Sequence, residues 1–357
     1  MNVRTSTADY EKWKASHIPL IKKDIAIKHE QMTASQFCFF RATFYRWLQL
    51  WEKECPQENK APKLLAVGDL HVENFGTWRD LEGRLIWGVN DFDEAYSMPY
   101  TIDLVRLATS ASLAAEEEHL ELKLREASDA ILEGYTEGLK FGGSPFILAE
   151  HNKWLRTIAL NRLRDPVRFW RRGAALPAFT TPIPKAVRRE LESTLPDPRL
   201  PYKQKRRVAG LGSLGHLRVV FFAHWGGGCV AREAKALAPS AYIWAKGQQT
   251  GPIRYREIVG RAVRVPDPFL RIDPGFLYRR LAPDCSRILL SSLPKDRDEY
   301  RLLRAMGFET ANIHLGSSKV IPEVLRDLRR RPEGWLRQAA RRMEKAVTLD
   351  WEHWRKN

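Results

Sequence analysis

The stretch that decides the fold is Gly68-Asp69-Leu70-His71-Val72-Glu73-Asn74-Phe75, which is followed after an apolar run by Asn90-Asp91-Phe92-Asp93. Asn74 stands five positions after Asp69, a spacing that suits a loop returning toward its own start. The apolar run, residues 85–89, predicts a buried strand bounded by polar residues. That strand would deliver Asp91 beside Asp69 and Asn74.

These three side chains fit the roles that phosphoryl transfer requires. One carboxylate accepts or orients the proton of the attacking hydroxyl, while an Asn and a second Asp hold Mg²⁺ against the nucleotide phosphates. We therefore predict Asp69 as the base or orienter, Asn74 and Asp91 as metal ligands with catalytic roles, and Asp93 as a further metal ligand. Gly-Asp and Asn-Asp pairs are also common turn chemistry. Several acids around one strand favour a site, because they repel one another without a cation.

A second motif is the glycine-rich segment Gly210-Leu211-Gly212-Ser213-Leu214-Gly215. Strand-like residues 217–222, a turn of three glycines and strand-like residues 229–232 follow it. Kinase glycine loops join two antiparallel strands, whereas a dinucleotide-binding loop of similar pattern opens a helix. We predict that Gly210, Gly212, Ser213 and Gly215 contact nucleotide phosphates. A flexible surface hairpin is the alternative, since glycine also serves simple tight turns.

The strand after the glycine turn carries Ala231-Arg232-Glu233-Ala234-Lys235, where a kinase places the cation that grips the nucleotide phosphates. Lys235 is the first candidate for this cation and Arg232 is its rival. Side chains three positions apart on a regular strand point to opposite faces, so only one of them should face the nucleotide. The sequence leaves the choice between them open, and a solvated basic edge strand is the alternative for both.

The loop and strand motif is similar to the aminoglycoside and choline kinase-like branch of the protein-kinase fold, although Val67 stands where that branch usually has His. More closely, the run from Gly68 through Asp91-Phe92-Asp93-Glu94 to Asp103-Leu104-Val105-Arg106-Leu107-Ala108 resembles a bacterial family catalogued as domain of unknown function 2252. This resemblance extends to Phe39-Phe40-Arg41 and to the glycine loop, and so over most of the chain. It implies that Asp103 braces the loop of Asp69, while a helix-start carboxylate facing the macrodipole is an equally good local explanation. For Arg41, a buried structural ion pair is favoured over contact with phosphate.

The kinase-like motifs stand in reversed order, because the glycine loop normally precedes the catalytic loop. Circular permutation would produce such an order without changing the packed core. The sequence therefore predicts an α+β, protein-kinase-like fold of two lobes, with a mainly helical large lobe and a small antiparallel β lobe. We expect residues 1–196 to form the helical lobe and residues 197–293 the nucleotide-binding lobe, with residues 294–357 as helices that return to the first. Prolines between Pro177 and Pro201 mark the boundary.

Helical periodicity is present in residues 10–27, 35–51, 100–134 and 294–357. The chain of 357 residues with 44% hydrophobic side chains is ordinary for two packed subdomains. It has no apolar signal core at its start and no apolar run of about 20 residues, so we expect a cytoplasmic protein without a membrane span. Its four cysteines form no Cys-x-x-Cys pair, which argues against a zinc ribbon.

Two other functions remain open. In one, His71 and Glu73 join Asp69, Asp91 and Asp93 as the ligands of a metal-dependent hydrolase, and His314 could join either site. In the other, the formal charge of +16 makes the chain a basic nucleic-acid-binding protein without catalysis, or attracts another anionic ligand. The hydrolase leaves the glycine hairpin unexplained, and no nucleic-acid readout motif is present.

The sequence thus favours an ATP-dependent and Mg²⁺-dependent phosphotransferase that acts on a hydroxyl of a small molecule. The acceptor and the oligomeric state are not identified by the motifs. The same motifs are also compatible with adenylyl transfer, or with a relative that has kept only nucleotide binding.

Overall fold

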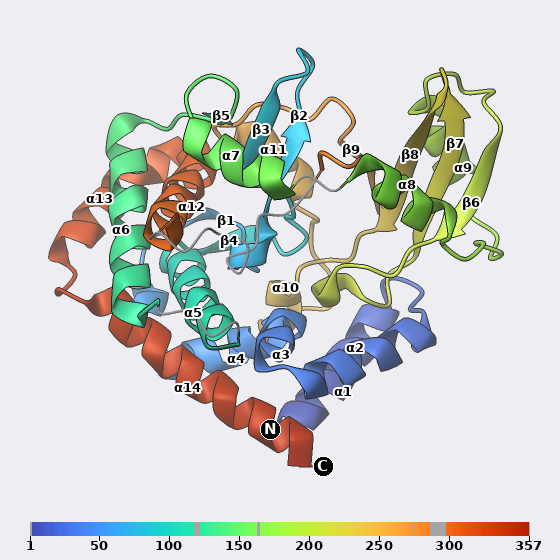
Figure 1. Cartoon of the computed structure of the whole chain (residues 1–357). Coiled ribbons are helices and arrows are strands. Elements are labelled where there is room, and N and C mark those ends of the chain that lie inside the picture. The colour runs from blue at the N-terminus through green and yellow to red at the C-terminus, as the bar shows by residue number, and fades with distance from the viewer. Residues whose placement is uncertain (1, 118–121, 163–164, 274, 286–297, 357) are drawn as a thin grey trace.

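A computed structural model describes residues 2–117, 122–162, 165–273, 275–285 and 298–356. These residues form a mixed α+β structure in which every paired strand is antiparallel, so the predicted class is confirmed at this level. Figure 1 shows the helices gathered around two small sheets, with a larger sheet set to one side.

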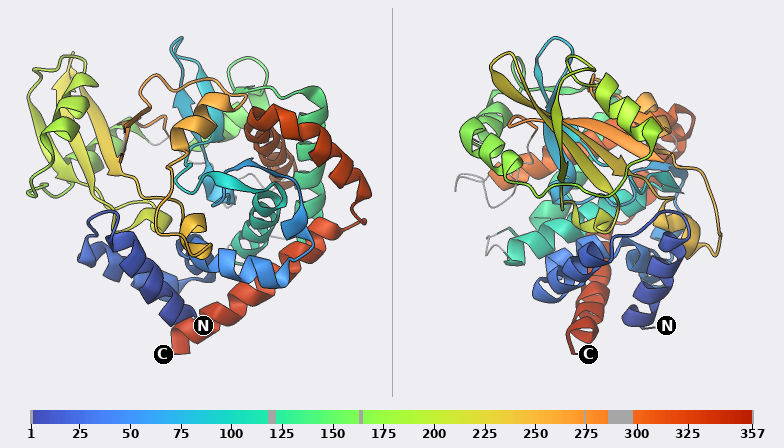
Figure 2. Two further views of the ribbon diagram at one scale, coloured as in Figure 1. Left: turned by 180° about the vertical axis from the view of Figure 1, so that it is seen from behind. Right: turned by 90° about the vertical axis from the view of Figure 1, so that its right-hand side faces the viewer.

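The helical part is built around α5 (Thr101–Glu117), whose residues from Thr101 to Ala115 are all buried. Because every face of this stretch is buried, α5 lies inside the protein together with its polar side chains, such as Asp103 and Arg106. The helices that enclose it are α4 (Phe44–Glu54), α6 (Leu124–Phe141), α12 (Asp298–His314), α13 (Ile321–Arg330) and α14 (Trp335–Lys356). The long α14 runs beneath them and reaches α1 (Val3–Ala15), where Arg4 donates to the carbonyl of Trp354 (Figures 1 and 2).

Helices α6 and α12 approach each other closely at two glycines. A Cβ on Gly134 would overlap the carbonyl oxygen of Arg304, and a Cβ on Gly307 would overlap that of Ile131. The backbones can therefore touch only because both side chains are absent. Because α12 carries Glu309 and His314, this contact also fixes the position of these two side chains behind the site described below.

We expect Gly134→Ala to lower the free energy of unfolding by about 2–3 kcal/mol, because one added methyl must push two packed backbones apart. Gly260→Ala is the matched control, since Gly260 is exposed on α11 (Tyr255–Arg261) with open space around it. That change should be neutral or stabilise by about 0.5–1 kcal/mol through helix propensity. Urea unfolding of both variants measures the difference, and equal effects would contradict the close approach.

The N-terminal helices differ from the prediction. Residues 10–27 are not one helix, because α1 ends at Ala15 and α2 (Lys22–Ala34) begins only after Pro19. Proline lacks the backbone N–H and fixes φ, so the chain turns there. The expected helix at 35–51 is divided at Thr43 into α3 (Gln36–Ala42) and α4. The helical prediction for 100–134 is confirmed as α5 and α6, apart from the residues between them that lie outside the description.

Two small sheets carry the loops of the first motif. Strands β1 (Lys63–Ala66) and β4 (Tyr96–Pro99) pair with each other, and β2 (Phe75–Arg79), β3 (Leu85–Val89) and β5 (Phe146–Ile147) form a sheet in that order. The predicted strand at 85–89 is confirmed as β3, and all five of its residues are buried. The segment after β1 holds Asp69 and the segment after β3 holds Asp91, so both emerge from the same buried region.

The larger sheet has the order β6-β7-β8-β10-β9. Its strands are β6 (Tyr202–Arg206), β7 (Arg218–Trp225), β8 (Gly228–Ala236), β9 (Arg271–Asp273) and β10 (Phe276–Leu281). The glycine loop joins β6 to β7, so a hairpin follows it as predicted, and residues 226–227 turn the chain into β8 with positive φ. Helix α9 (Lys185–Ser193) covers one face of the sheet, and α8 (Pro166–Ala174) covers the other.

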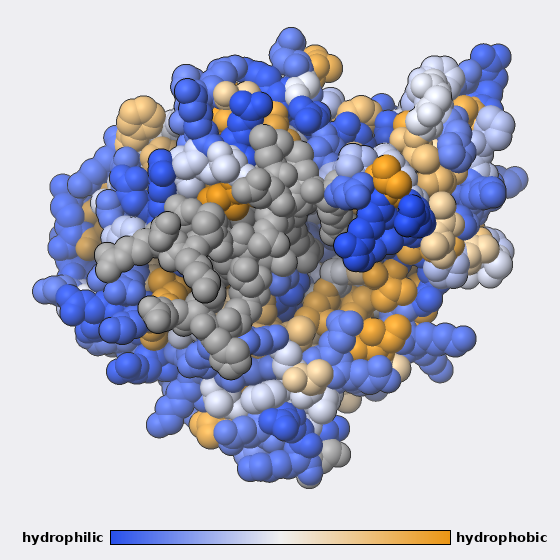
Figure 3. All heavy atoms as spheres, in the orientation of Figure 1, coloured by the Kyte–Doolittle hydropathy of each residue, from blue (hydrophilic) through white to orange (hydrophobic). Residues whose placement is uncertain are grey.

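Three short helices complete the described chain: α7 (Lys153–Arg162), α10 (Ala241–Ala245) and α11. The 3-10 turns are η1 (Glu58–Lys60), η2 (Val72–Asn74), η3 (Leu211–Ser213) and η5 (Leu315–Val320). The surface in Figure 3 is mainly hydrophilic, with apolar side chains gathered between α8 and α2. Among the described residues, no helix is long and apolar enough to cross a membrane.

Candidate functional site

The loop that carries Asp69 is held from below by Asp103, on the first turn of α5. The two carboxylate oxygens of Asp103 accept hydrogen bonds from the backbone N–H groups of Val67 (2.7 Å) and Gly68 (2.8 Å). His314 Nε2 lies 2.9 Å from the same carboxylate, and its Nδ1 lies 2.8 Å from the hydroxyl of Tyr135. All these side chains are buried. Asp103 therefore braces the loop through direct contacts, and the macrodipole alone does not describe its position.

Asp69 is held by Arg106, which lies three residues after Asp103 on α5. Arg106, fully buried, donates from Nε (2.8 Å) and Nη2 (2.5 Å) to Oδ1 of Asp69. Burial raises the pKa of Asp69, and Arg106 opposes that rise. The second oxygen, Oδ2, faces the glycine loop, where a Cβ on Gly212 would lie 3.3 Å from it. One oxygen of Asp69 is thus held and the other faces the loop.

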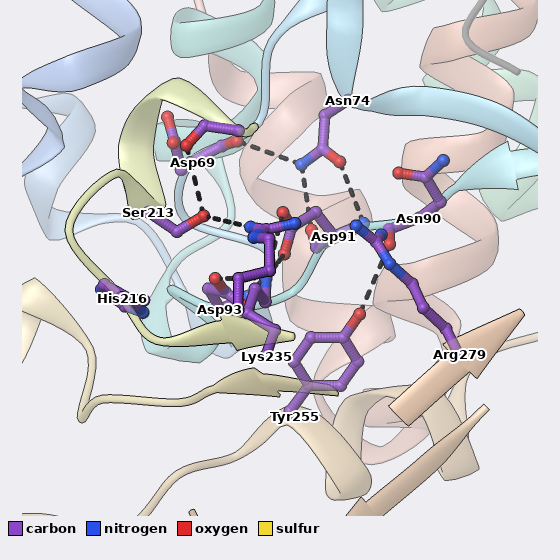
Figure 4. A network of polar contacts seen from close by, with 12 residues as sticks. Asp69, Asn74, Asn90, Asp91, Asp93, Ser213, His216, Lys235, Tyr255 and Arg279 are labelled. Atoms are coloured by element: carbon purple, nitrogen blue, oxygen red, sulfur yellow. Dashed lines mark hydrogen bonds and ion pairs between the residues drawn. The ribbon is translucent and has the colours of Figure 1, made fainter. Parts of the chain in front are cut away.

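Asn74 connects the two motif segments through its side-chain amide. Its Nδ2 donates to the carbonyls of Asp69 (3.2 Å) and Asp91 (3.0 Å), and its Oδ1 accepts from the N–H of Asp91 (3.0 Å). The structure therefore brings Asp69, Asn74 and Asp91 together, as predicted from their spacing (Figure 4). The amide of Asn74 is mainly a bracket between backbones, and only the second lone pair of Oδ1 is left for a further partner.

Lys235 on β8 meets the acidic segment after β3. Its ammonium lies 2.7 and 2.6 Å from the oxygens of Asp93, and 3.3 and 3.5 Å from those of Asp91. The Lys235 side chain is 1% exposed. Burial and the neighbouring Asp91 raise the pKa of Asp93 to about 6, whereas Lys235 holds the pKa of Asp91 well below its usual range despite burial. Four carboxylate oxygens thus converge on one cation (Figure 4).

Arg232 points to the opposite face of the sheet, as strand alternation requires. It donates to the carbonyl of Thr194 (2.8 Å) and lies over the ring of Phe269 at 4.4 Å. It does not reach the acidic segment. Of the two candidates that the sequence left open, only Lys235 faces Asp91 and Asp93.

Glu233, between these two residues, was not predicted as a site residue. Its buried carboxylate accepts hydrogen bonds from Arg207 (2.6 Å), Arg218 (3.2 Å) and Arg279 (2.7 Å). Arg218 also donates to Ser213 Oγ in the glycine loop (2.8 Å). Three arginines hold the pKa of Glu233 well below its usual range although burial opposes this. These arginines come from separate segments, so no local pattern indicated the cluster.

The glycine loop, residues 210–215, is folded tightly over the segment that carries Asp69. Gly210 and Gly215 have φ of 78° and 97°, a region that residues with a Cβ rarely adopt. Gly215 accepts a hydrogen bond from the N–H of Ile21 (2.8 Å), which ties the loop to the start of α2. Gly212 and Ser213 lie above Asp69 and Arg218 respectively. Gly210, Gly212 and Ser213 therefore line the same cavity as Asp69 and Asp91, whereas Gly215 packs against Leu20 and Ile25.

A cavity of about 50 Å³ lies between the glycine loop, the Asp69 and Asp91 segments and the N-terminal helices. Asp69, Asn74, Asp91, Asp93 and Glu94 line it, together with residues that the motifs did not indicate: Tyr10, Lys14, Tyr45 and His216. Arg41 also lines it and pairs with Glu73 at 2.5 Å, as the predicted ion pair. These residues come from α1, from α4 and from the end of the glycine loop. Their spacing in the sequence is ordinary for a helix or a loop, so it does not indicate a binding site.

The side chains named for a hydrolase are not assembled as a metal centre. Within the described ranges, no group of three or more His, Cys, Asp or Glu side chains is placed to hold a metal ion. Glu73 pairs with Arg41, and His71 Nδ1 accepts from the N–H of Glu73 (3.2 Å). His314 lies with Asp103 beneath the loop, so it joins neither cluster of acids in the cavity.

Glu309 on α12 supports β3 from behind. Its carboxylate accepts from the N–H of Val89 (3.2 Å) and from Asn312 Nδ2 (2.7 Å). Burial raises the pKa of Glu309 to about 7. Because the folded pKa lies above the unfolded one, folding favours the protonated acid. Its contribution to stability is therefore complete below about pH 4.5 and is lost as the pH rises through about 7.

We expect the stability of the wild type relative to Glu309→Gln to fall by on the order of 3 kcal/mol between acidic pH and pH 8, at about 1.4 kcal/mol per pKa unit. The difference between the two proteins isolates the titration, since every other group is shared. Urea unfolding at several pH values measures it, with exposed Glu323→Gln as the control. A difference that does not change with pH would show that Glu309 titrates normally.

Residues 20–168 match the model of a family described as an uncharacterized protein conserved in bacteria (DUF2252). The matched region contains Arg41, Asp69, Asn74, Asp91 and Asp103, and it supports the bacterial family that these motifs resemble. The match ends before the glycine loop, so it does not extend over most of the chain. No curated protein and no solved structure matches this sequence.

Proposed function

We propose that this protein is an ATP-dependent, kinase-like phosphotransferase that acts on a hydroxyl of a small molecule. The observation that carries the proposal is the meeting of Lys235, from the third strand of the large sheet, with Asp91 and Asp93 beside Asp69 and Asn74. In protein kinases the glycine loop joins two strands and the phosphate-binding Lys lies on the third. The β6 to β8 segment has the same order of parts.

The proposed architecture has two lobes in permuted order. Residues 1–196 and 294–357 would supply the helical lobe, and residues 197–293 the lobe that binds nucleotide. The contact between α1 and α14 is compatible with this arrangement, because in a permuted chain these two helices would flank the point where the parent chain was opened. The site would then lie where the glycine loop meets the Asp69 and Asp91 segments.

A larger cavity of about 630 Å³ adjoins the glycine loop and suits the nucleotide base. Its walls include the apolar residues Val220, Phe222 and Ala231 of the sheet, and Arg207 and Gly210 lie at its edge. Ligand sites of about 300–1,000 Å³ with apolar walls and a few polar groups are typical for molecules of this size. The phosphates would extend from this cavity toward Lys235.

The donor set fits Mg²⁺. Asp91, Asp93 and Asn74 offer only oxygen ligands, which this cation prefers, and the carboxylates already converge on a positive charge. When bound with ATP, the ion would neutralise charge on the phosphates. Lys235 would hold phosphate oxygens, and Asp93 and Asp91 would then exchange the ammonium for the ion.

Asp69 would orient the acceptor and receive its proton. The acceptor oxygen forms a bond to the γ-phosphorus while the bond to the β–γ bridging oxygen breaks and ADP leaves. The hydroxyl proton passes to Oδ2 of Asp69, since Oδ1 is held by Arg106. Asp103 and Arg106 act as positioning residues, because they set the place of Asp69 without facing the acceptor.

Isothermal calorimetry of ATP with and without Mg²⁺ tests the proposal without knowledge of the acceptor. The wild type should bind ATP in a metal-dependent manner, and Asp91→Asn should weaken that binding about 100-fold or more. Asp69→Asn is the matched variant in the same cavity, and it should retain Mg·ATP binding while losing transfer. No binding by a folded wild type, or equal binding by Asp91→Asn, would refute the proposal.

A further inference from the structure

Two buried lysines on the N-terminal helices make no close ion pair, although Glu94 and Glu11 attract both from a longer distance. Lys14 on α1 is 5% exposed and Lys28 on α2 is 2% exposed. Neither ammonium makes an ion pair within 4.0 Å among the residues that the structure describes; Lys14 instead lies 4.8 Å from the ring centre of Tyr10, and Lys28 5.4 Å from that of Tyr45. A buried ammonium without a partner is costly, so such a group is seldom retained for stability alone.

Lys14 reaches the same small cavity as Asp69. Both residues line it, together with Tyr10 and Tyr45, whose stacked rings lie 4.2 Å apart. Lys28 lies behind Tyr45 and adds positive potential. Burial lowers the pKa of Lys28 to about 8 and also lowers that of Lys14, which leaves Lys28 mainly charged at neutral pH.

A second group that lines this cavity without a close partner is a hydrogen-bond acceptor. His216, 5% exposed, places its Nδ1 2.8 Å from the carbonyl of Ala236, so Nδ1 carries the proton. Its Nε2 is buried and has no hydrogen-bond partner within the described chain. Burial keeps the pKa of His216 well below its usual range, so the ring is neutral. In Figure 4, His216 stands beside Ser213 at the margin of the polar network.

The acids of the cavity already have partners of their own. Asp69 pairs with Arg106, Glu73 with Arg41, and Asp91 and Asp93 with Lys235. Glu94 accepts hydrogen bonds from the hydroxyl of Ser240 (3.0 Å) and from the N–H of Ala241 (2.6 Å). Among the groups that line the cavity, Lys14 and the neutral acceptor His216 Nε2 are therefore left to meet a ligand.

We infer that this cavity binds a small hydroxylated anion, whose carboxylate or phosphate lies at Lys14 and whose hydroxyl groups meet His216 Nε2 and Asp69. The inference rests on the proposed phosphotransferase, because it names the charge of the acceptor at that same site. The acceptor must be small, since a cavity of about 50 Å³ holds only a few water-sized groups, each of which needs about 10–15 Å³. A cationic acceptor would face Lys14 and be repelled.

Four compounds that share one propanediol frame test the charge: glycerate, glycerol 3-phosphate, glycerol and 3-amino-1,2-propanediol. Calorimetry without nucleotide should show binding of glycerate or glycerol 3-phosphate at least about tenfold tighter than glycerol, and no binding of the amine. Glycerate and glycerol 3-phosphate distinguish a carboxylate from a phosphate ligand. Tighter binding of glycerol or of the amine would overturn the inference, as would no binding of either anion.

Lys14→Met should weaken binding of the preferred anion about tenfold or more and leave Mg·ATP affinity unchanged. Lys12→Met, exposed on the same helix, should change neither. Lys14→Met should also raise the Tm of the free protein, because it removes an unpaired buried charge; a lower Tm with unchanged anion binding would show a structural role. If Lys14→Met fails to fold, Lys14→Gln, which removes the charge but keeps a polar end, provides the second variant.

The two proposals fail separately. Mg·ATP binding without anion preference would leave the phosphotransferase standing and overturn the anionic acceptor. Anion binding that depends on Lys14, without any Mg·ATP binding, would support the anion site and refute the phosphotransferase.

Discussion

Lys235→Met should abolish Mg·ATP binding and lower the free energy of unfolding by about 2–3 kcal/mol at pH 8, because it leaves two partly buried carboxylates facing each other without a cation. The four oxygens of Asp91 and Asp93 lie within 3.5 Å of the Lys235 ammonium, so no other side chain replaces it without movement. Urea unfolding and calorimetry measure the two effects. Adding Asp93→Asn to Lys235→Met should recover stability but not nucleotide binding.

Two controls separate this effect from loss of any basic residue. Lys203→Met, exposed on β6 of the same sheet, should change stability by no more than about 0.5 kcal/mol. Arg232→Met should reduce stability, since Arg232 holds the Thr194 carbonyl, but leave Mg·ATP affinity unchanged. Nucleotide binding that survives in Lys235→Met and disappears in Arg232→Met would reverse the assignment of the phosphate cation.

Asp103→Ala should lower the free energy of unfolding by about 3–5 kcal/mol, because it leaves two buried backbone N–H groups and the imidazole of His314 without an acceptor, at about 1–3 kcal/mol each. The loop of Asp69 would lose its attachment to α5, so phosphoryl transfer should fall with it. Denaturant unfolding gives the first quantity, and ADP release in the presence of an acceptor gives the second.

Glu323→Ala is the matched control for Asp103→Ala. Glu323 also lies in the first turn of its helix, α13, but it is exposed. If the carboxylate of Asp103 acted only on the helix macrodipole, both variants would lose about 0.3–1 kcal/mol. A large loss confined to Asp103→Ala supports the loop brace, and equal small losses would contradict it.

The parts of the site that could be predicted are those encoded within short segments. The run 85–89 is apolar and bounded by polar residues, so strand β3 and the position of Asp91 after it followed directly. The glycine hairpin was predicted for the same reason, because β-branched and aromatic residues surround it. Periodicity failed at 10–27, since a helical pattern continues across Pro19 whereas the backbone does not.

The remaining contacts join segments that are distant in sequence, so no local pattern contains them. Arg106 reaches Asp69 only because α5 passes beneath the loop. Which of Lys235 and Arg232 faces the acidic segment depends on which face of β8 is turned toward that segment, and the sequence does not show this. Lys14 had one usable signal, its place four residues after Tyr10 on an otherwise buried stripe. That pattern shows a lysine turned inward but says nothing about which cavity it meets.

The two hydrophobic clusters on the faces of the large sheet bear on how the protein unfolds. One cluster packs α9 against Val219, Phe221 and Tyr278, and the other packs α8 against Val220 and Phe222; both are separate from the main helical core. A segment with its own core can open as a cooperative unit while the rest stays folded. Lys235 lies on this sheet, whereas Leu211 and Leu214 of the glycine loop pack in the main helical core. Only the Lys235 side of the proposed site would therefore be supplied by a part of the protein that can open and close on its own.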